Sequence, residues 1–239
     1  MIYDHNYKPW KRLHNKFIKR NDGNQYNGAY YYSIEIVRNI IPRVRTDRDW
    51  WTITVKGHMT EHSIVFIHQN SAPEKMEWIK DYDDVILVCS LPQVAKALKK
   101  YARTIYIPLS VDVEEVKKYR TKKTKDTAYI GRKQRLKEWE CEKLPDGIDY
   151  IYRLPREKFL AKVAKYKTVY ASERAAIEAK ILGCKVEQYV KPLMDVEFEI
   201  IDNKEAAKML QKELDKIDKG EKNDKGRNYK RLGSVKTIL

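Results

Sequence analysis

The chain has 239 residues, 42% of them hydrophobic, and its 49 Lys and Arg outnumber 34 Asp and Glu to give a formal charge of +15. This length and apolar content suffice to bury a substantial core, which excludes a wholly disordered chain. The N-terminus has no apolar signal region and no stretch approaches the roughly 18 apolar residues of a membrane span, so the sequence predicts a cytoplasmic protein. The charge favours polyanionic partners, with a generally basic surface kept for solubility as the alternative.

Cysteine and histidine usage indicates neither a disulfide framework nor a metal site. Cys89, Cys141 and Cys184 lie far apart and form no CxxC pair. Cys89 and Cys184 stand in apolar segments, so we expect reduced core residues. The five histidines show no metal-ligand spacing, and a zinc centre or other bound cofactor is therefore not expected.

The first predicted elements form an N-terminal half. Asn27-Gly28 opens a segment with apolar residues at helical spacing as far as Ile41, and Pro42 ends it. Pro92 begins a second helix. Short apolar or alternating runs predict four strands, at 51–55, 63–68, 84–90 and 104–107.

A lysine-rich stretch at 117–126 then interrupts the apolar pattern, and the boundary between two halves is expected there. Beyond it, helices are predicted from Arg156, at 172–182, and from Asn203, which is expected to cap its helix. Strands are predicted between them at 128–130, 149–152, 168–171, 185–189 and near 198–201. The predicted organisation is an N-terminal half (1–115), a C-terminal half (116–202), and a helix with a basic tail (203–239).

Short strands that alternate with helices indicate βαβ units and a parallel sheet. Two such runs predict an α/β fold with two Rossmann-like parallel-sheet halves that face a cleft. Open parallel sheets bind ligands at the carboxyl ends of their strands, where the strand order reverses. The functional site is therefore expected in the cleft.

Two candidate residues belong to the N-terminal half. Gly28 precedes the first helix, where a glycine lets the backbone approach an anion, although a plain loop glycine explains it equally well. His68 directly follows a buried strand, where it is suited to act as a base or to hydrogen-bond a substrate hydroxyl. A histidine that merely satisfies loop backbone is the alternative.

The C-terminal half offers a cationic strand end and two helical glutamates. Gly131, Arg132 and Lys133 follow a strand, and a close backbone with two adjacent cations suits a diphosphate better than it suits a plain basic surface. Glu173 and Glu178 lie on the helix predicted at 172–182, where a carboxylate complements the helix dipole or accepts ribose and sugar hydroxyls. Glu178 stands between Ile177 and Ala179, which argues against a plain solvated role.

Four segments, taken together and in order, resemble the retaining GT-B glycosyltransferases over roughly residues 27–190. Val88-Cys89-Ser90 resembles the strand that closes the family's N-terminal half, and Ile107-Pro108-Leu109-Ser110-Val111-Asp112 resembles its I-P-N-G-V-D crossover. Tyr129-Ile130-Gly131-Arg132 resembles the family's v-G-R, and Glu178-Ala179 with Gly183-Cys184-Lys185-Val186 resembles its E-A-x3-G-x-P-V.

The resemblance implies a role for each candidate. Arg132 and Lys133 would hold the diphosphate of a nucleotide-sugar, with a UDP-sugar first among the donors, and Glu178 would hold its ribose. Gly28 would approach the donor phosphate, and His68 would lie near the acceptor.

The sequence departs from the family in its paired glutamates. The family places two glutamates eight positions apart, whereas Tyr170 stands eight positions before Glu178. Glu173 lies five positions before Glu178, which is not the family's spacing. Together with His68 it is the candidate for a catalytic group. Arg135 and Lys137 are further candidates for the family's diphosphate-binding lysine.

The leading hypothesis is a glycosyltransferase. Small GT-B transferases of bacterial viruses include enzymes that glycosylate modified bases in DNA, and the charge of +15 is compatible with a DNA acceptor. The alternative is a non-catalytic GT-B-like protein that binds a nucleotide or nucleic acid. A third hypothesis is a structural nucleic-acid-associated protein with Trp50, Trp51 and 30–32 as stacking groups. The sequence leaves the oligomeric state open.

Overall fold

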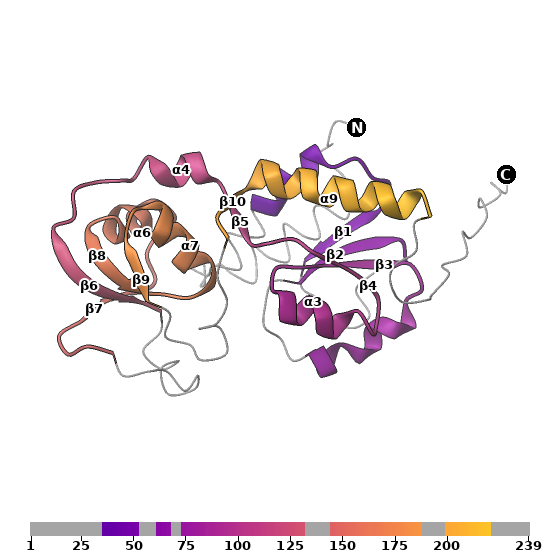
Figure 1. The fold of residues 1–239 in the computed structure, drawn as a ribbon, viewed down its shortest axis with the longest axis horizontal. Helices are drawn as coiled ribbons and strands as arrows, with labels where there is room; N and C mark the ends of the chain where they lie inside the picture. The colour runs from indigo at the N-terminus through magenta and orange to yellow at the C-terminus, as the bar shows by residue number, and fades with distance from the viewer. Residues whose placement is uncertain (1–34, 53–60, 68–72, 132–143, 188–198, 221–239) are drawn as a thin grey trace.

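The computed structural model of the chain describes residues 35–52, 61–67, 73–131, 144–187 and 199–220 (Figure 1). Within these residues the fold is mixed α/β, with two separate four-stranded parallel sheets. The predicted α/β class and its parallel sheets are confirmed. Among the described helices, none is long and apolar enough to cross a membrane.

The first sheet has the order β1-β2-β3-β4, and each strand is parallel to its neighbour. All five residues of β2 and all five of β3 are buried, as the apolar runs predicted. The strands are β1 (Asp49–Thr52), β2 (Ser63–Ile67), β3 (Val85–Cys89) and β4 (Arg103–Tyr106). They confirm the four predicted strands with shifted ends, while 53–55 and His68 lie outside the described residues.

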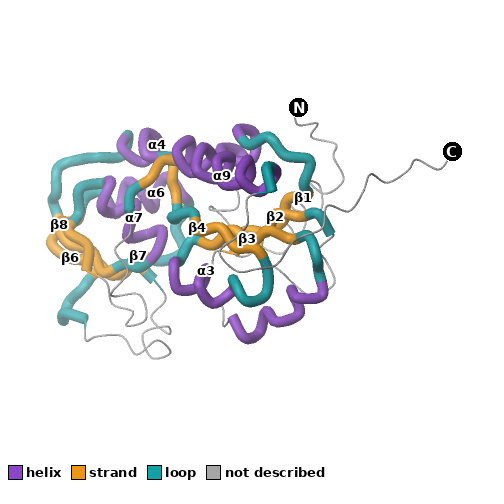
Figure 2. The backbone as a smooth tube through the Cα atoms, turned by 45° about the vertical axis from the view of Figure 1, so that its right-hand side comes forward, coloured by secondary structure: helices purple, strands orange, loops and turns teal. Residues whose placement is uncertain are grey.

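Helices cover both faces of this sheet in Figures 1 and 2, with α9 on one side and α3 on the other. The connections are the 3-10 helix η3 (Pro73–Asp81) and the helix α3 (Pro92–Leu98). Pro92 begins α3, which confirms that prediction. The sequence did not predict η3, because among its described side chains only Met76 and Ile79 are buried, too few to show a helical period.

The segment before β1 corrects the helix that Pro42 was expected to end. The structure has a π-helical turn, η1 (Ile36–Ile40), followed without a break by a 3-10 turn, η2 (Ile41–Arg43). Pro42 lies near the start of η2, where its missing N–H has no helical partner to lose. The helical run therefore continues through Pro42 to Arg43, with a change from π to 3-10 geometry at Ile41.

The second sheet has the order β7-β6-β8-β9 and is also parallel. Its elements are β6 (Lys125–Ile130), β7 (Asp149–Ile151), α6 (Arg156–Val163), β8 (Tyr166–Tyr170), α7 (Glu173–Ile181) and β9 (Lys185–Glu187). The chain adds β7 on one side of β6 and then returns to add β8 on the other. The strand order therefore reverses between β6 and β8.

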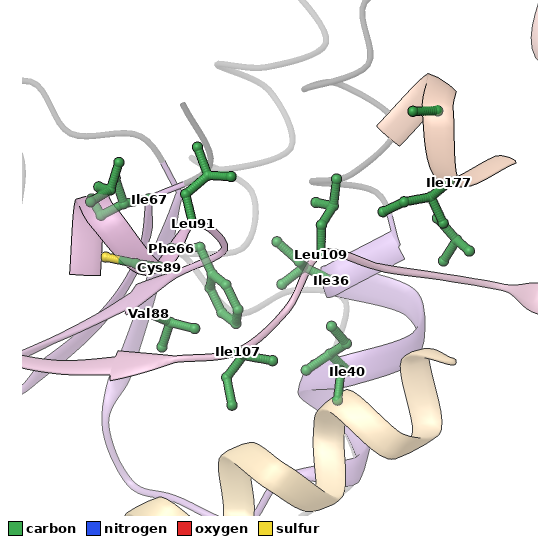
Figure 3. Packing of buried hydrophobic residues seen from close by; sticks show 14 of the residues in the cluster. Ile36, Ile40, Phe66, Ile67, Val88, Cys89, Leu91, Ile107, Leu109 and Ile177 are labelled. Atoms are coloured by element: carbon green, nitrogen blue, oxygen red, sulfur yellow. The ribbon is translucent and has the colours of Figure 1, made fainter. Parts of the chain in front are cut away.

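The chain crosses between the two sheets twice, and the two crossing segments are paired with each other. The first crossing, from the first sheet to the second, contains β5 (Ser110–Val111) and α4 (Val113–Lys117). The second crossing, which returns to the first half, contains β10 (Ile201–Asp202). The strands β5 and β10 form a short parallel ladder. Figure 3 shows Ile36, Leu109 and Ile177 among the buried apolar residues around this junction.

The long helix α9 (Asn203–Asp218) returns to the first half and packs on η1 and η2. Its buried stripe includes Ala207, Leu210 and Leu214, as its helical period predicted. The N-cap is Asp202, whose carboxylate accepts the Lys204 N–H at 2.8 Å. The prediction that Asn203 caps this helix is therefore wrong.

Two of the cysteines are core residues, as predicted. Cys89 and Cys184 are buried and form no disulfide. Burial raises the pKa of the Cys89 thiol to about 12. Cys141 lies outside the described residues.

Candidate functional site

The strand order of the second sheet indicates where a ligand would bind. In open parallel sheets, ligands occupy the crevice outside the carboxyl ends of the two strands between which the order reverses. Here these strands are β6, which ends at Ile130, and β8, which ends at Tyr170. The described strands of the first sheet follow one another in a single direction, so they provide no such point.

Both strands end in unusual backbone at this place. Gly131 follows β6 with a φ of 152°, a conformation that side chains rarely adopt, and its N–H donates to the Ile151 carbonyl at 3.2 Å. Glu173 begins α7 just after β8 with a φ of 51°. A non-glycine residue in the left-handed region costs about 1–3 kcal/mol, and such residues cluster at ligand-binding sites.

The first turn of α7 points toward the first half. Arg174, the second residue of α7, donates from Nη2 to Oε1 of Glu35, which precedes η1. The carboxyl edge of the second sheet, where α7 begins, therefore faces the first half.

Four charged side chains form a closed ring across this junction. Oε1 of Glu178 accepts hydrogen bonds from Nη1 of Arg156 at 2.5 Å and from Nε of Arg174 at 2.6 Å. Both arginines also reach Oε1 of Glu35, Arg174 through a hydrogen bond and Arg156 through Nη2 at 3.8 Å. The ring alternates in sign and has no net charge, which offsets the cost of removing ions from water.

The ring is buried. Glu178 is 2% exposed and Arg174 is 5% exposed. Burial by itself would lower the pKa of Arg174, but the carboxylates of Glu178 and Glu35 outweigh it and raise that pKa above its ordinary value. Arg174 therefore keeps its positive charge.

Glu35 also binds the two crossings of the chain. Its Oε2 accepts the backbone N–H of Asp112 at 3.2 Å and Nδ2 of Asn203 at 2.9 Å. Beside them, Oδ2 of Asp202 accepts the N–H of Val113 at 3.2 Å. One carboxylate thus joins α7, the outgoing crossing and the start of α9.

Unpartnered polar atoms gather at the same junction. Among the described residues, four buried side-chain atoms have no hydrogen-bond partner: Arg174 Nη1, Asn203 Oδ1, Ser110 Oγ and Trp51 Nε1. The first three lie on α7, α9 and β5, and β5 contacts both helices. Because buried polar groups are normally paired, these donors and acceptors are available to the polar atoms of a ligand or a water molecule.

The predicted site residues divide into two groups. Gly131, Glu173 and Glu178 are described, the first two beside the reversal of strand order and the third one turn deeper in α7. Gly28, His68, Arg132 and Lys133 lie outside the described residues.

Sequence reasoning missed three of the four members of the ring. Arg174 stands four positions before Glu178, the spacing of an ion pair on one helix face, and this signal was available. Arg156 and Glu35 come from distant segments that no local pattern connects to Glu178.

A second cluster of charges lies at the edge of the first sheet where its strands begin. His62 precedes β2 and Asp84 precedes β3, so both lie at the amino ends of their strands. Nδ1 of His62 lies 2.6 Å from Asp84 Oδ2, and Nε2 lies 2.9 Å from Asp47 Oδ1. Parallel sheets bind ligands at the other edge, so this cluster is an ion-pair site. In the described part of the chain, no group of three or more His, Cys, Asp or Glu side chains is arranged to hold a metal ion.

No protein-family model and no curated protein matches this chain.

Proposed function

We propose that this protein is a glycosyltransferase with a reduced GT-B-like arrangement, which moves a sugar from a nucleotide-sugar donor to an acceptor. The donor binds at the carboxyl edge of the second sheet, and the acceptor approaches from the first half. The observation that carries the proposal is the reversal of strand order between β6 and β8, with Gly131 and the start of α7 beside it.

The geometry at this place supports a diphosphate. The backbone conformation at Gly131 needs a glycine, and the absence of a side chain there leaves room for the phosphates to approach the main chain. The first N–H groups of α7 lie beside it and carry partial positive charge. In this proposal Arg132 and Lys133, which follow directly in the sequence, add the cations that a diphosphate requires.

The remaining candidates take roles around the diphosphate. Glu178, which Arg156 and Arg174 hold in place, accepts the ribose hydroxyls of the donor. Glu173 and His68 are the candidates for catalytic groups at the sugar and the acceptor. The cations and the helix dipole stabilise the charge that develops on the departing diphosphate, which is the largest electrostatic need of this reaction.

A screen of nucleotide-sugars tests the proposal. The full chain is incubated with UDP-, GDP-, ADP- and dTDP-sugars, and the released nucleoside diphosphate is measured beside the calorimetric binding of each donor. We expect one nucleotide to bind and its sugar donor to be consumed. Arg132→Ala should weaken that binding by about 1.5–3 kcal/mol, the contribution of a charged hydrogen bond. Lys158→Ala removes an exposed cation of α6 and should leave the binding unchanged.

A non-catalytic nucleotide-binding protein is the second candidate, and the closed ring favours it. The carboxylate of Glu178 already binds two arginines, and Tyr170 stands where the family has its first paired glutamate. In that case the same screen shows binding of a nucleotide without release of nucleoside diphosphate from any sugar donor. Absence of both binding and release contradicts both candidates.

A further inference from the structure

The exposed side of α9 carries a row of lysines. Lys204, Lys208, Lys212 and Lys216 follow one another at four-residue spacing, and Lys219 comes next. Side chains at this spacing lie on the same face of a helix. The opposite face is buried and packs on η1 and η2, so the row lies on the outward face of α9.

The row lies between two hollows in the surface. The first hollow, of about 710 Å³, runs along α9 and is closed on its other side by Arg43 of η2. The second, of about 600 Å³, separates α9 from α3 and β4 and contains Lys96, Lys99 and Tyr106. Lys212 lines both hollows, so the two form one continuous surface, called here the α9 basic surface.

The charge on this surface is largely uncompensated. Eight cations line the two hollows against two carboxylates, Asp215 and Glu213. Glu213 pairs with Lys216 at 2.6 Å, and Asp215 accepts from Gln211 at 2.8 Å. Within the described part of the chain, the other lysines of the surface form no ion pair: Lys96, Lys99, Lys204, Lys208, Lys212 and Lys219.

The helix α4 shows a different arrangement, in which the lysines are paired. On α4, Lys117 pairs with Glu114 at 2.8 Å, and its neighbour Lys118 pairs with Glu115 at 2.6 Å. Such pairs are the usual arrangement of a solvated helix face. On the α9 basic surface, by contrast, the unpaired lysines repel one another, and a bound polyanion would remove that repulsion.

The length of the α9 basic surface favours an extended polyanion over a small anion. From Lys204 to Lys219 the helix extends about 22 Å at 1.5 Å per residue. A strand of nucleic acid presents a phosphate about every 3.4 Å along the duplex axis, so about six phosphates would span that length. One small phosphorylated molecule would engage only a fraction of it.

The form of the surface argues against a membrane and for a nucleic acid. A helix that binds a membrane surface inserts its apolar face, whereas the apolar face of α9 is buried in the protein. Tyr106 is 41% exposed and lines the second hollow with Lys96, Lys99 and Lys212. An aromatic ring among cations in a groove is the composition of surfaces that bind single strands, where bases stack on the ring.

We infer that the α9 basic surface binds a single strand of nucleic acid, with the phosphates along the lysines of α9 and an unpaired base against Tyr106. This inference does not depend on the proposed sugar transfer. The row begins at Lys204, next to Asn203 at the junction of the halves, so a bound strand would extend from the candidate site along the first half.

Fluorescence anisotropy of the full chain with a labelled single strand of about 16 nucleotides tests the inference. The test variant is Lys204→Gln/Lys208→Gln/Lys212→Gln, and Lys117→Gln/Lys118→Gln/Lys122→Gln is the control that removes the same net charge elsewhere. We expect the test variant to bind about tenfold or more weakly at about 50 mM salt, and its log–log salt slope to shrink by about 2, since each single-strand phosphate contact contributes about 0.7. The control should bind like the unmodified chain.

A second pair of variants tests the aromatic contact. Tyr106→Ala should weaken single-strand binding by about five- to a hundredfold, whereas Tyr106→Phe keeps the ring and should retain it. Equal loss in the two lysine variants would show a non-specific charge effect and overturn the inference. It would also be overturned by binding that prefers a duplex and ignores Tyr106→Ala, or by binding only to phosphatidylserine vesicles. Circular dichroism melts of all variants exclude unfolding as the cause of any loss.

Discussion

Arg174 and Glu35 stand 139 positions apart in the sequence, yet Nη2 of Arg174 donates a hydrogen bond to Oε1 of Glu35 at the junction of the two halves. Because Arg174 also binds Glu178 of its own helix, one guanidinium connects the carboxyl edge of the second sheet to the segment that precedes the first. The relative position of the halves thus depends on a buried ion pair beside the candidate donor site.

Removal of this guanidinium should destabilise the protein strongly. Arg174→Met leaves Glu35 and Glu178 with Arg156 alone in a buried place, and breaking a buried ion pair from one side costs about 3–5 kcal/mol. Lys80→Met is the control, since it breaks the exposed Lys80–Glu77 pair and should cost under about 1 kcal/mol. Urea unfolding measures both, and equal stability of the two variants would show that the ring contributes little.

Variants of the two carboxylates of the ring should distinguish a structural role from a role in ligand binding. Glu35→Gln and Glu178→Gln each remove one negative charge from the ring and should lower the free energy of unfolding by comparable amounts. Under the proposed function, only Glu178→Gln should also weaken nucleotide binding, by about 1.5–3 kcal/mol in a calorimetric titration, because only Glu178 accepts from the ribose. Equal loss of binding in both would indicate that Glu178 acts only by holding the halves together.

The glycine at the end of β6 provides a further test. Gly131→Ala strains the backbone at a φ of 152°, and Gly147→Ala strains an open turn at a φ of 71°, where a Cβ would meet nothing within 4 Å. Both should be destabilised, since alanine disfavours positive φ. Nucleotide binding should fall only in Gly131→Ala, because Gly147 precedes β7 at the other edge of the sheet. A comparable decrease in both variants would argue against a phosphate site at Gly131.

The histidine cluster predicts a dependence of stability on pH. Burial lowers the pKa of His62, but its hydrogen bonds to Asp84 and Asp47 outweigh this and raise that pKa above the ordinary 6.5. The contribution of His62 to stability is therefore full below pH 6.5 and is lost as the pH rises through the raised pKa. Burial raises the pKa of Asp84, but His62 and Arg48 together outweigh it and lower that pKa, so the contribution of Asp84 is lost on acidification below the ordinary 3.8.

His62→Asn isolates this effect, because asparagine tolerates the φ of 61° at this position. The difference in unfolding free energy between the unmodified chain and the variant should be largest near about pH 5–6 and should shrink by about pH 9. A difference that is independent of pH would mean that the imidazole contributes only through uncharged contacts.

Much of the fold could be predicted from the sequence because its signals are local. The apolar runs of β2 and β3 and the helical period of Leu210 and Leu214 each reflect burial that neighbouring residues already encode. The residues that cap the ends of helices were harder to predict. Asp202 and Asn203 are both good capping residues, and only the tertiary contact of Asn203 with Glu35 decides between them.

The candidate site could be predicted only where a motif carried it. Glu178 stood out because a carboxylate among small and apolar neighbours suggests burial, and it is 2% exposed. Its partners Arg156 and Glu35 could not be found, since ion pairs across a junction leave no period in the sequence. The two-residue strands β5 and β10 are likewise too short for any alternation to appear.

The pairing of β5 with β10 has a consequence for how the protein is made. The whole second sheet lies in sequence between the two crossings, and α9, which packs on η1 and η2, follows the second of them. During synthesis the first sheet therefore leaves the ribosome complete in its strands but without the helix that covers one of its faces. That face remains uncovered by α9 until the entire second half has been translated. In this protein the N-terminal half is synthesised first, but the last helix to be synthesised completes it.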